Sequence, residues 1–199
     1  MLDKKNIIST LPSQNLVMIE LGCGNFKKKS AYIGIDLNDH EDVDIVGDVY
    51  EVLSAFPNES VNEIHSFHFF EHIKDVARLL SELERILKHN GIIEIVVPHF
   101  SNTYFYSDFT HKNMFGLFSL SYLAKDKYLN HKVPLYNSDT QLSLNYVKLY
   151  FSSPLYINRP FRWLQQLLFN SFPLMKEWYE ESWSRTFPCY EIKYMLTKV

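Results

Sequence analysis

Short apolar runs and one helical repeat divide the first half of the chain. Four apolar runs of strand length occupy residues 17–21, 33–36, 43–49 and 61–67. Residues 76–87 instead repeat apolar side chains at spacings of three and four, which predicts an amphipathic helix with Asp75 as its N-cap and Gly91 as its stop. Residues 92–97 are nearly all apolar and end at Pro98, which is typical of a strand buried on both faces. This order of elements predicts an α/β domain.

Two alternating patterns lie in the second half of the chain. The apolar members of these patterns are Leu142, Leu144 and Tyr146 in the first, and Tyr190, Ile192, Tyr194 and Leu196 in the second. Each predicts a half-buried strand, and together they predict an antiparallel hairpin. Between them lies an aromatic-rich insertion, residues 152–188, in which we expect one or two amphipathic helices. We expect their apolar faces to pack on the domain; a lid over an acceptor pocket, a dimer contact and docking to a membrane surface are the alternatives.

Composition excludes some partners. The 199 residues include 20 basic and 23 acidic side chains, for a formal net charge of -3. The only basic run is residues 27–29, which we expect to be a solvated loop, with contact to an anionic acceptor as the alternative. Nucleic acid is therefore not expected as a partner.

Cysteine content and hydropathy suggest a compartment. The chain has two cysteines, too few for a disulfide framework, which favours a reducing environment. We find neither a leader-like N-terminus nor an apolar run long enough to span a bilayer. A cytoplasmic protein without stable membrane insertion is the expectation.

The run from residue 17 to residue 25 carries the most specific chemistry. Glu20 ends an apolar strand and is followed by Gly22 and Gly24, where the absence of a Cβ lets the backbone pass close to a ligand. Asp36 ends the next predicted strand, where its carboxylate can accept hydrogen bonds from both hydroxyls of a ribose. The pattern predicts a nucleoside-binding loop.

The spacing counts against a dinucleotide. A nicotinamide-binding loop needs a third glycine at position 27, which is Lys27, and a ribose acid about 20 residues beyond the loop. Here Asp36 follows Gly24 by only twelve positions. A nicotinamide-dependent oxidoreductase is therefore the weaker alternative.

Taken together, residues 14–100 resemble class I S-adenosylmethionine-dependent methyltransferases, through Glu20-x-Gly22-x-Gly24, the strand ending at Asp36, Asp48, the run at residues 68–72 and the helix that follows. The resemblance implies a single domain, residues 1–199, with a Rossmann-like fold. Its sheet would be mostly parallel and seven-stranded, with an antiparallel C-terminal hairpin and helices on both faces. Residues 14–100 would be the cofactor-binding half and residues 101–199 the acceptor-side half.

The resemblance also implies a cofactor and its contacts. S-adenosylmethionine would be the methyl donor and S-adenosylhomocysteine the product. Glu20 would orient the glycine loop and the cofactor's amino group, Asp36 would hold the ribose, and Asp48 with Val49 the adenine. The full set of expected cofactor-binding residues is Glu20, Gly22, Cys23, Gly24, Asp36, Leu37, Asp48, Val49, Phe67 and His68.

One departure from the family pattern concerns the first crossover. Only eleven residues separate Gly24 from Asp36, too few for the usual full helix between the first two strands. We expect a short or irregular crossover and a more open cofactor site on that side.

Candidate catalytic residues follow the fourth and fifth predicted strands. They are His72, His99, Asp108 and His111. Imidazole and carboxylate groups at the carboxyl ends of strands are suited to orienting or deprotonating an acceptor. A structural role is the alternative for His72, and capping of the core is the alternative for the aromatic side chains of residues 100–109. No metal is expected, because no paired spacing such as H-x-x-x-H is present.

The narrower resemblance is to small methyltransferases of bacterial surface-polysaccharide biosynthesis. It implies methyl transfer to a hydroxyl of a small molecule or a cell-surface sugar intermediate; nothing in the residues excludes transfer to nitrogen or carbon. A homodimer is a possible assembly. A module that binds S-adenosylmethionine without catalysing transfer is the second functional alternative.

Overall fold

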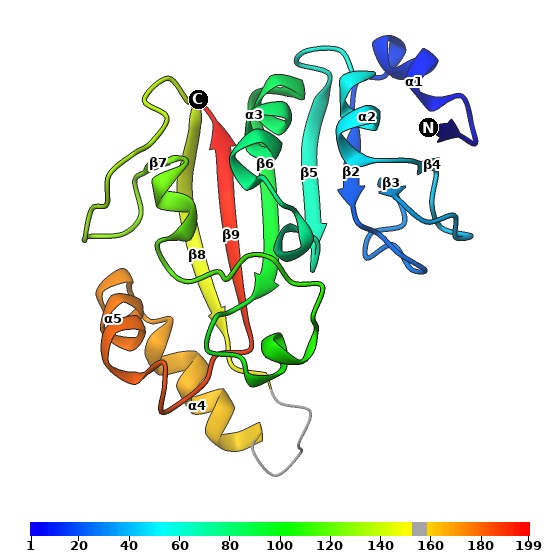
Figure 1. Ribbon diagram of the computed structural model, residues 1–199. Helices are drawn as coiled ribbons and strands as arrows, with labels where there is room; N and C mark the ends of the chain where they lie inside the picture. Colours follow the sequence, from blue (N-terminus) through cyan, green and yellow to red (C-terminus); the bar gives the residue numbers. More distant parts are fainter. Residues whose placement is uncertain (153–158) are drawn as a thin grey trace.

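A computed structural model describes residues 1–152 and 159–199, which form a nine-stranded sheet (Figure 1). The strands are β1 (Leu2–Asp3), β2 (Met18–Leu21), β3 (Ile33–Asp36), β4 (Ile45–Val46), β5 (Val61–Phe67), β6 (Leu87–Pro98), β7 (Lys125–Asp126), β8 (Leu142–Tyr150) and β9 (Glu191–Lys198). Their order across the sheet is β1-β4-β3-β2-β5-β6-β9-β8-β7. Strands β2 to β6 run parallel to one another, and β9 runs antiparallel to both β6 and β8.

The predicted mostly parallel sheet with an antiparallel hairpin is confirmed. The strand number is higher than seven because β1 and β7, two residues each, extend the two edges. Strand β4 is also shorter than the predicted run 43–49, because Asp48 already caps the next helix.

The described helices are α1 (Ile7–Thr10), α2 (Val49–Ser54), α3 (Val76–Ile86), α4 (Arg159–Phe169) and α5 (Pro173–Trp178). Short 3₁₀ turns cover Leu11–Ser13, Phe70–His72, Thr103–Ser107 and Ser119–Tyr122, and a π-helical turn covers Tyr179–Trp183. The predicted N-cap of α3 is present, since the Asp75 side chain accepts a bond from the Arg78 N–H. The predicted stop at Gly91 is wrong: Leu87 is already extended, and Gly91 lies inside β6.

Helices α2 and α3 cover one face of the sheet (Figure 1). On this side β9 buries Ile192, Tyr194 and Leu196. Of the alternate positions, Lys193 forms an ion pair of 2.5 Å with Glu94 of β6. Among the described residues no helix joins β2 to β3, as the short spacing predicted.

A bulge shifts the register of β8 between Leu144 and Tyr146. Beyond the bulge Val147 and Leu149 are buried, whereas Tyr146 is 36% exposed. The prediction that Tyr146 faces inward is therefore wrong, because one extra residue in a strand moves every later side chain to the other face.

The predicted helices of the insertion are α4 and α5, while residues 153–158 of the insertion lie outside the described part. Phe169 of α4 is buried, but other apolar side chains of this helix are 48 to 64% exposed: Phe161, Trp163, Leu164, Leu167 and Leu168. The expectation that the apolar faces pack on the domain holds for only part of α4. None of the described helices has the length and apolar character needed to cross a membrane.

Candidate functional site

The strand order reverses between β2 and β5. From β2 the chain builds β3 and β4 on one side, and it then crosses to β5 and β6 on the other. The residues that follow β2 and β5 therefore meet at one edge, where open α/β sheets bind their ligands.

The glycine loop after β2 presents an open surface. Gly22 and Gly24 have φ angles of +66° and +56°, which side chains rarely adopt. A Cβ on Gly22 would lie 2.6 Å from the Phe69 ring, so this position must be glycine. Nothing lies within 4 Å of a Cβ placed on Gly24, so a ligand can approach the backbone there.

Asp36 lies beside this open surface. Its Oδ2 accepts the Gly24 N–H at 2.9 Å, and its Oδ1 accepts the Asn38 N–H at 2.8 Å. Each carboxylate oxygen has a second lone pair, so Asp36 can also accept two ligand hydroxyls. Leu37, the next residue, is 69% exposed and offers an apolar surface at the same edge. The cluster fits a nucleoside.

Glu20 binds the backbone of the glycine loop from the buried side. It is 1% exposed, and its carboxylate accepts the backbone N–H groups of Lys28 at 2.9 Å and Lys29 at 3.2 Å. The expectation of a solvated basic loop is wrong for Lys27, whose side chain is 12% exposed and pairs with buried Asp44 at 2.7 Å. The bonds of Glu20 to Lys28 and Lys29, and the ion pair of Lys27 with Asp44, hold the glycine loop against the sheet.

Asp48 and Val49, which we expect at the adenine, lie at the start of α2. Asp48 is exposed and caps α2, accepting the N–H groups of Tyr50 and Glu51 through Oδ1. The Val49 side chain is 8% exposed and belongs to the core, and its expected place beside the adenine stays a prediction. Burial, with the negative charges of Asp36 and Glu20, raises the pKa of Cys23 to about 12, so this loop cysteine is a neutral thiol.

His68, directly after β5, lies between two carboxylates. Its Nε2 lies 3.0 Å from Glu191 Oε1, and its Nδ1 lies 3.3 Å from Glu71 Oε1. Burial opposes the charged form, but the hydrogen bond to Glu191 and the negative charges of Glu71 and Glu191 raise the pKa of His68 to about 9. His68 is therefore an imidazolium at neutral pH. The neighbouring Phe67 ring faces the Lys28 Nζ at 4.4 Å.

Three of the four candidate catalytic residues come together. His72 Nδ1 lies 3.0 Å from Thr110 Oγ1, which donates to Asp108 Oδ1 at 2.6 Å. His111 Nε2 lies 3.6 Å from Asp108 Oδ2, and the rings of His72 and His111 are 4.9 Å apart. Hydrogen bonds from the Thr110 side chain and backbone lower the pKa of Asp108.

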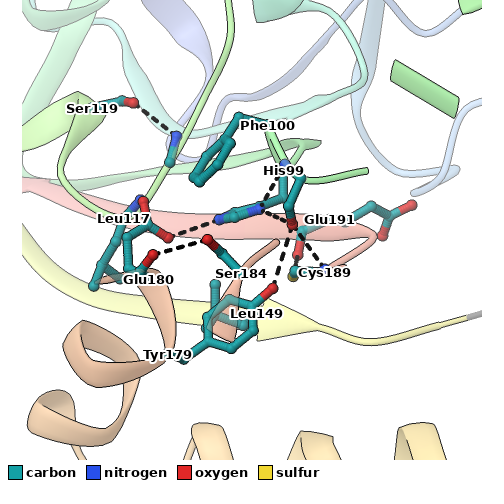
Figure 2. Close-up of polar contacts among 12 residues, drawn as sticks. His99, Phe100, Leu117, Ser119, Leu149, Tyr179, Glu180, Ser184, Cys189 and Glu191 are labelled. Carbon is teal, nitrogen blue, oxygen red and sulfur yellow. Dashed lines mark hydrogen bonds and ion pairs between the residues drawn. The ribbon is translucent and has the colours of Figure 1, made fainter. Parts of the chain in front are cut away.

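His99 does not join this cluster. It is fully buried: its Nε2 lies 2.9 Å from Glu180 Oε2, and its Nδ1 lies 2.8 Å from Ser101 Oγ. Figure 2 shows the ring enclosed by this network, with Tyr179 and Cys189 nearby. Because both ring nitrogens are engaged and no ring atom reaches solvent, the prediction of a catalytic His99 is corrected to a structural role.

The aromatic side chains after β6 divide between core and surface. Phe105 is 7% exposed and stacks on the His111 ring at 4.6 Å, so it supports the site from within. Tyr104 and Phe109 are 53% and 97% exposed. The structure thus assigns a core-capping role to Phe105 and leaves Tyr104 and Phe109 at the surface.

Three residues of this site were missed by sequence reasoning. Glu71 is fully buried, and its backbone carbonyl accepts the N–H groups of Lys112 and Asn113, which ties the two segments together. Thr110 links His72 to Asp108. Glu191 pairs with His68 across 123 positions, a contact that no local pattern signals.

Comparisons with known proteins agree with this geometry. Residues 11–145 match the family model described as a methyltransferase domain. No curated protein sequence matches the chain.

Solved structures share the fold at low sequence identity. A SAM-dependent methyltransferase from Archaeoglobus fulgidus is 17% identical, with a TM-score of 0.55 over 96% of this chain and 93% of that one. The YcgJ protein from Bacillus subtilis is 15% identical, with a TM-score of 0.54 over 96% of both chains. A Haemonchus contortus phosphoethanolamine N-methyltransferase 2, in complex with phosphomonomethylethanolamine and S-adenosylhomocysteine, is 16% identical, with a TM-score of 0.52 over 96% of this chain and 52% of that one.

Proposed function

Since the chain belongs to the methyltransferase domain family, with S-adenosylmethionine as its cofactor, we propose that it methylates a hydroxyl group of a small molecule or a cell-surface sugar intermediate. The observation that carries the hydroxyl assignment is the chain of contacts from His72 through Thr110 to Asp108, beside the cofactor edge of the sheet.

The glycine loop and two acids would hold the cofactor. The open backbone at Gly24 would admit its methionine portion, and Asp36 would accept bonds from the ribose hydroxyls. The two capping bonds of Asp48 go to Oδ1, so its Oδ2 would be the oxygen offered to the adenine amino group. Glu20 would act through the loop, because its carboxylate binds the loop amides and is buried. When bound, the cofactor supplies an activated methyl group on a sulfonium.

The acceptor-side residues would position and deprotonate the hydroxyl. The Thr110 hydroxyl has one proton, and the 2.6 Å bond to Asp108 uses it, so His72 Nδ1 donates to Thr110 Oγ1. In the neutral ring, His72 Nε2 then carries the lone pair that can accept a proton from the acceptor. The Asp108 carboxylate, reached through Thr110, would stabilise the charge that His72 gains. Orienting the hydroxyl in line with the methyl group is the larger contribution expected of such a site.

A transfer assay with two acceptor panels tests this proposal. The purified protein is incubated with methyl-labelled S-adenosylmethionine and either sugars with free hydroxyls or primary amines. We expect label in the sugars, and a decrease in kcat of about 100-fold or more for His72→Gln. His89→Gln, which changes an exposed histidine, is the control and should leave the rate unchanged. Labelled amines with unlabelled sugars would contradict the hydroxyl assignment.

Location and assembly are also proposals. Cys23 and Cys189 are both free and buried, which supports a reducing, cytoplasmic compartment. A homodimer is the assembly that size-exclusion chromatography with light scattering would test.

A further inference from the structure

Glu71 is a buried carboxylate without a hydrogen bond. It is fully buried, and neither side-chain oxygen makes a hydrogen bond within the described residues. Its nearest charged neighbour is His68, whose Nδ1 lies 3.3 Å from Oε1. A buried carboxylate is costly unless a cation or several donors compensate it, and a single imidazole nitrogen at this distance compensates it only in part.

Two imidazoles lie beside this carboxylate. One ligand atom each from Glu71, His72 and His111 lie within 4.8 Å of one another. The segments that carry them are fastened together, because the Glu71 carbonyl oxygen accepts the Lys112 N–H at 2.7 Å. The three side chains therefore converge on a defined point.

Hydrogen bonding fixes which nitrogen each ring presents. His111 Nδ1 lies 2.8 Å from the Phe105 carbonyl oxygen, which can only accept, so Nδ1 carries a proton and, in the neutral ring, Nε2 is the nitrogen with the lone pair. His72 Nδ1 donates to Thr110 Oγ1, so Nε2 is likewise the nitrogen that can bind a metal in the neutral ring. Metal-binding histidines commonly have this arrangement, with the second ring nitrogen donating to a carbonyl or to a carboxylate-linked group.

The charge around the cluster favours a divalent cation. Three carboxylates, those of Glu71, Asp108 and Glu191, lie around the imidazole rings of His68, His72 and His111. This concentration of carboxylates attracts a cation.

We propose that Glu71, His72 Nε2 and His111 Nε2 bind one divalent transition-metal ion, such as Zn²⁺. Two imidazoles and a carboxylate suit zinc, iron, cobalt or nickel better than magnesium or calcium. Three protein ligands leave a position open, as in catalytic rather than structural zinc sites. The ion's role in catalysis rests on the proposed function: it would bind the acceptor hydroxyl and lower its pKa, and the proton would then pass to solvent water rather than to His72.

Zinc binding tests the site without cofactor or acceptor. The full-length protein is treated with EDTA, dialysed and titrated with Zn²⁺ by calorimetry, and Co²⁺ is used as an optical probe. We expect one equivalent of Zn²⁺ to bind, with affinity reduced at least tenfold in Glu71→Gln, His72→Gln and His111→Gln. His89→Gln should bind as the wild type does, and Mg²⁺ should not compete. The proposal is overturned if the folded protein binds no stoichiometric zinc, or if none of the three substitutions weakens binding.

A fourth variant covers the case in which His111→Gln fails to fold, since this ring stacks on Phe105. Thr110→Val keeps all three ligands but removes the acceptor of the His72 N–H, and we expect a loss of zinc affinity of several-fold, whereas unchanged affinity would count against the assigned ring orientation. Methyl transfer without zinc binding would reject the metal site alone. Zinc binding without methyl transfer to any hydroxyl would reject the proposed function alone.

Discussion

His99 and Glu180, 81 positions apart in the sequence, form a hydrogen bond of 2.9 Å between Nε2 and Oε2. The other oxygen of Glu180 accepts the Leu117 N–H at 2.7 Å. One carboxylate therefore fastens the end of β6, the loop at Leu117 and the π-helical turn after α5 to one another (Figure 2). A Cβ on Gly116 would lie 2.4 Å from Glu180 Oε1, so the loop fits around this side chain.

Glu180→Gln should destabilise the fold. The Ser101 N–H donates to His99 Nδ1, so His99 Nε2 carries the ring proton and needs an acceptor at position 180. An amide has one acceptor oxygen for two donors, and we expect a loss of about 1.5 to 3 kcal/mol in the free energy of unfolding. Urea denaturation measures this loss. Glu181→Gln, an exposed neighbour, is the control, and equal stability of the two variants would contradict the assigned role.

Asp36→Ala should weaken binding of S-adenosylhomocysteine. The substitution removes the expected acceptor of the ribose hydroxyls and the anchor of the Gly24 N–H. We expect a loss of at least about 1.4 kcal/mol, or tenfold in Kd, by calorimetric titration. Asp39→Ala, which removes only a surface pair with Lys4, is the matched control. NADH should not bind; NADH binding together with unchanged affinity of Asp36→Ala would argue against the nucleoside assignment.

The two glycines of the loop should respond differently to alanine. Gly22→Ala places a methyl group 2.6 Å from Phe69, so we expect a loss of stability of about 2 to 4 kcal/mol from backbone strain and overpacking. Gly24→Ala meets no atom within 4 Å, so its cost should be only about 1 to 2 kcal/mol of backbone strain. Thermal unfolding compares the two. Because its methyl group would enter the proposed ligand surface, Gly24→Ala should still lose cofactor affinity.

Stability should depend on the ionisation of His68. Its folded pKa of about 9 lies above the ordinary value of 6.5, so the stabilisation is complete below about pH 6.5 and is lost as pH rises through 9. The shift corresponds to about 3.4 kcal/mol before solvent screening, which we expect to reduce it to about 2 to 3 kcal/mol because the side chain is 31% exposed. His68→Asn, which tolerates the φ of +52° at this position, should abolish that loss.

The measurement is urea denaturation of wild type and His68→Asn at pH 6.5, 7.5 and 9. The quantity compared is the free energy of unfolding of the wild type minus that of His68→Asn. Burial lowers the pKa of Lys176 to about 8, so Lys176 makes the stability of both proteins rise with pH, and its effect cancels in this difference. A difference that does not change with pH would refute the charge assigned to His68.

Most of the parallel sheet could be predicted from the sequence, because its strands are apolar runs that end at polar residues. Strand β5 has the predicted bounds, Val61–Phe67, and β3 ends at Asp36 as predicted. Tyr146 could not be placed, since a bulge depends on pairing with β9 rather than on local pattern. Gly91 was misassigned because the contact between Leu87 and Val61 draws the chain into the strand before the glycine is reached.

The site divides in the same way. Gly22, Gly24 and Asp36 are close in sequence, and their spacing alone indicates their shared surface. His99 was misassigned because its partner, Glu180, lies in an insertion whose packing the sequence does not reveal. Lys27 was misassigned for a similar reason, since its partner Asp44 is 17 positions away and buried.

Tyr150, the last residue of β8, pairs with Glu191, the first residue of β9. The segment between the two strands therefore starts and ends at neighbouring points of the sheet. A segment attached at neighbouring points can change its length or composition during evolution while the strand register stays intact. Glu180 limits this freedom, because the loop at Leu117 depends on it, and so do Gln166 and Asn170, which bond the backbone at Phe151, just after β8, and at Leu149 of β8. Within the described residues, the exposed apolar side chains of α4 make no such bonds to the sheet, so we expect divergence to concentrate there while the cofactor half stays unchanged.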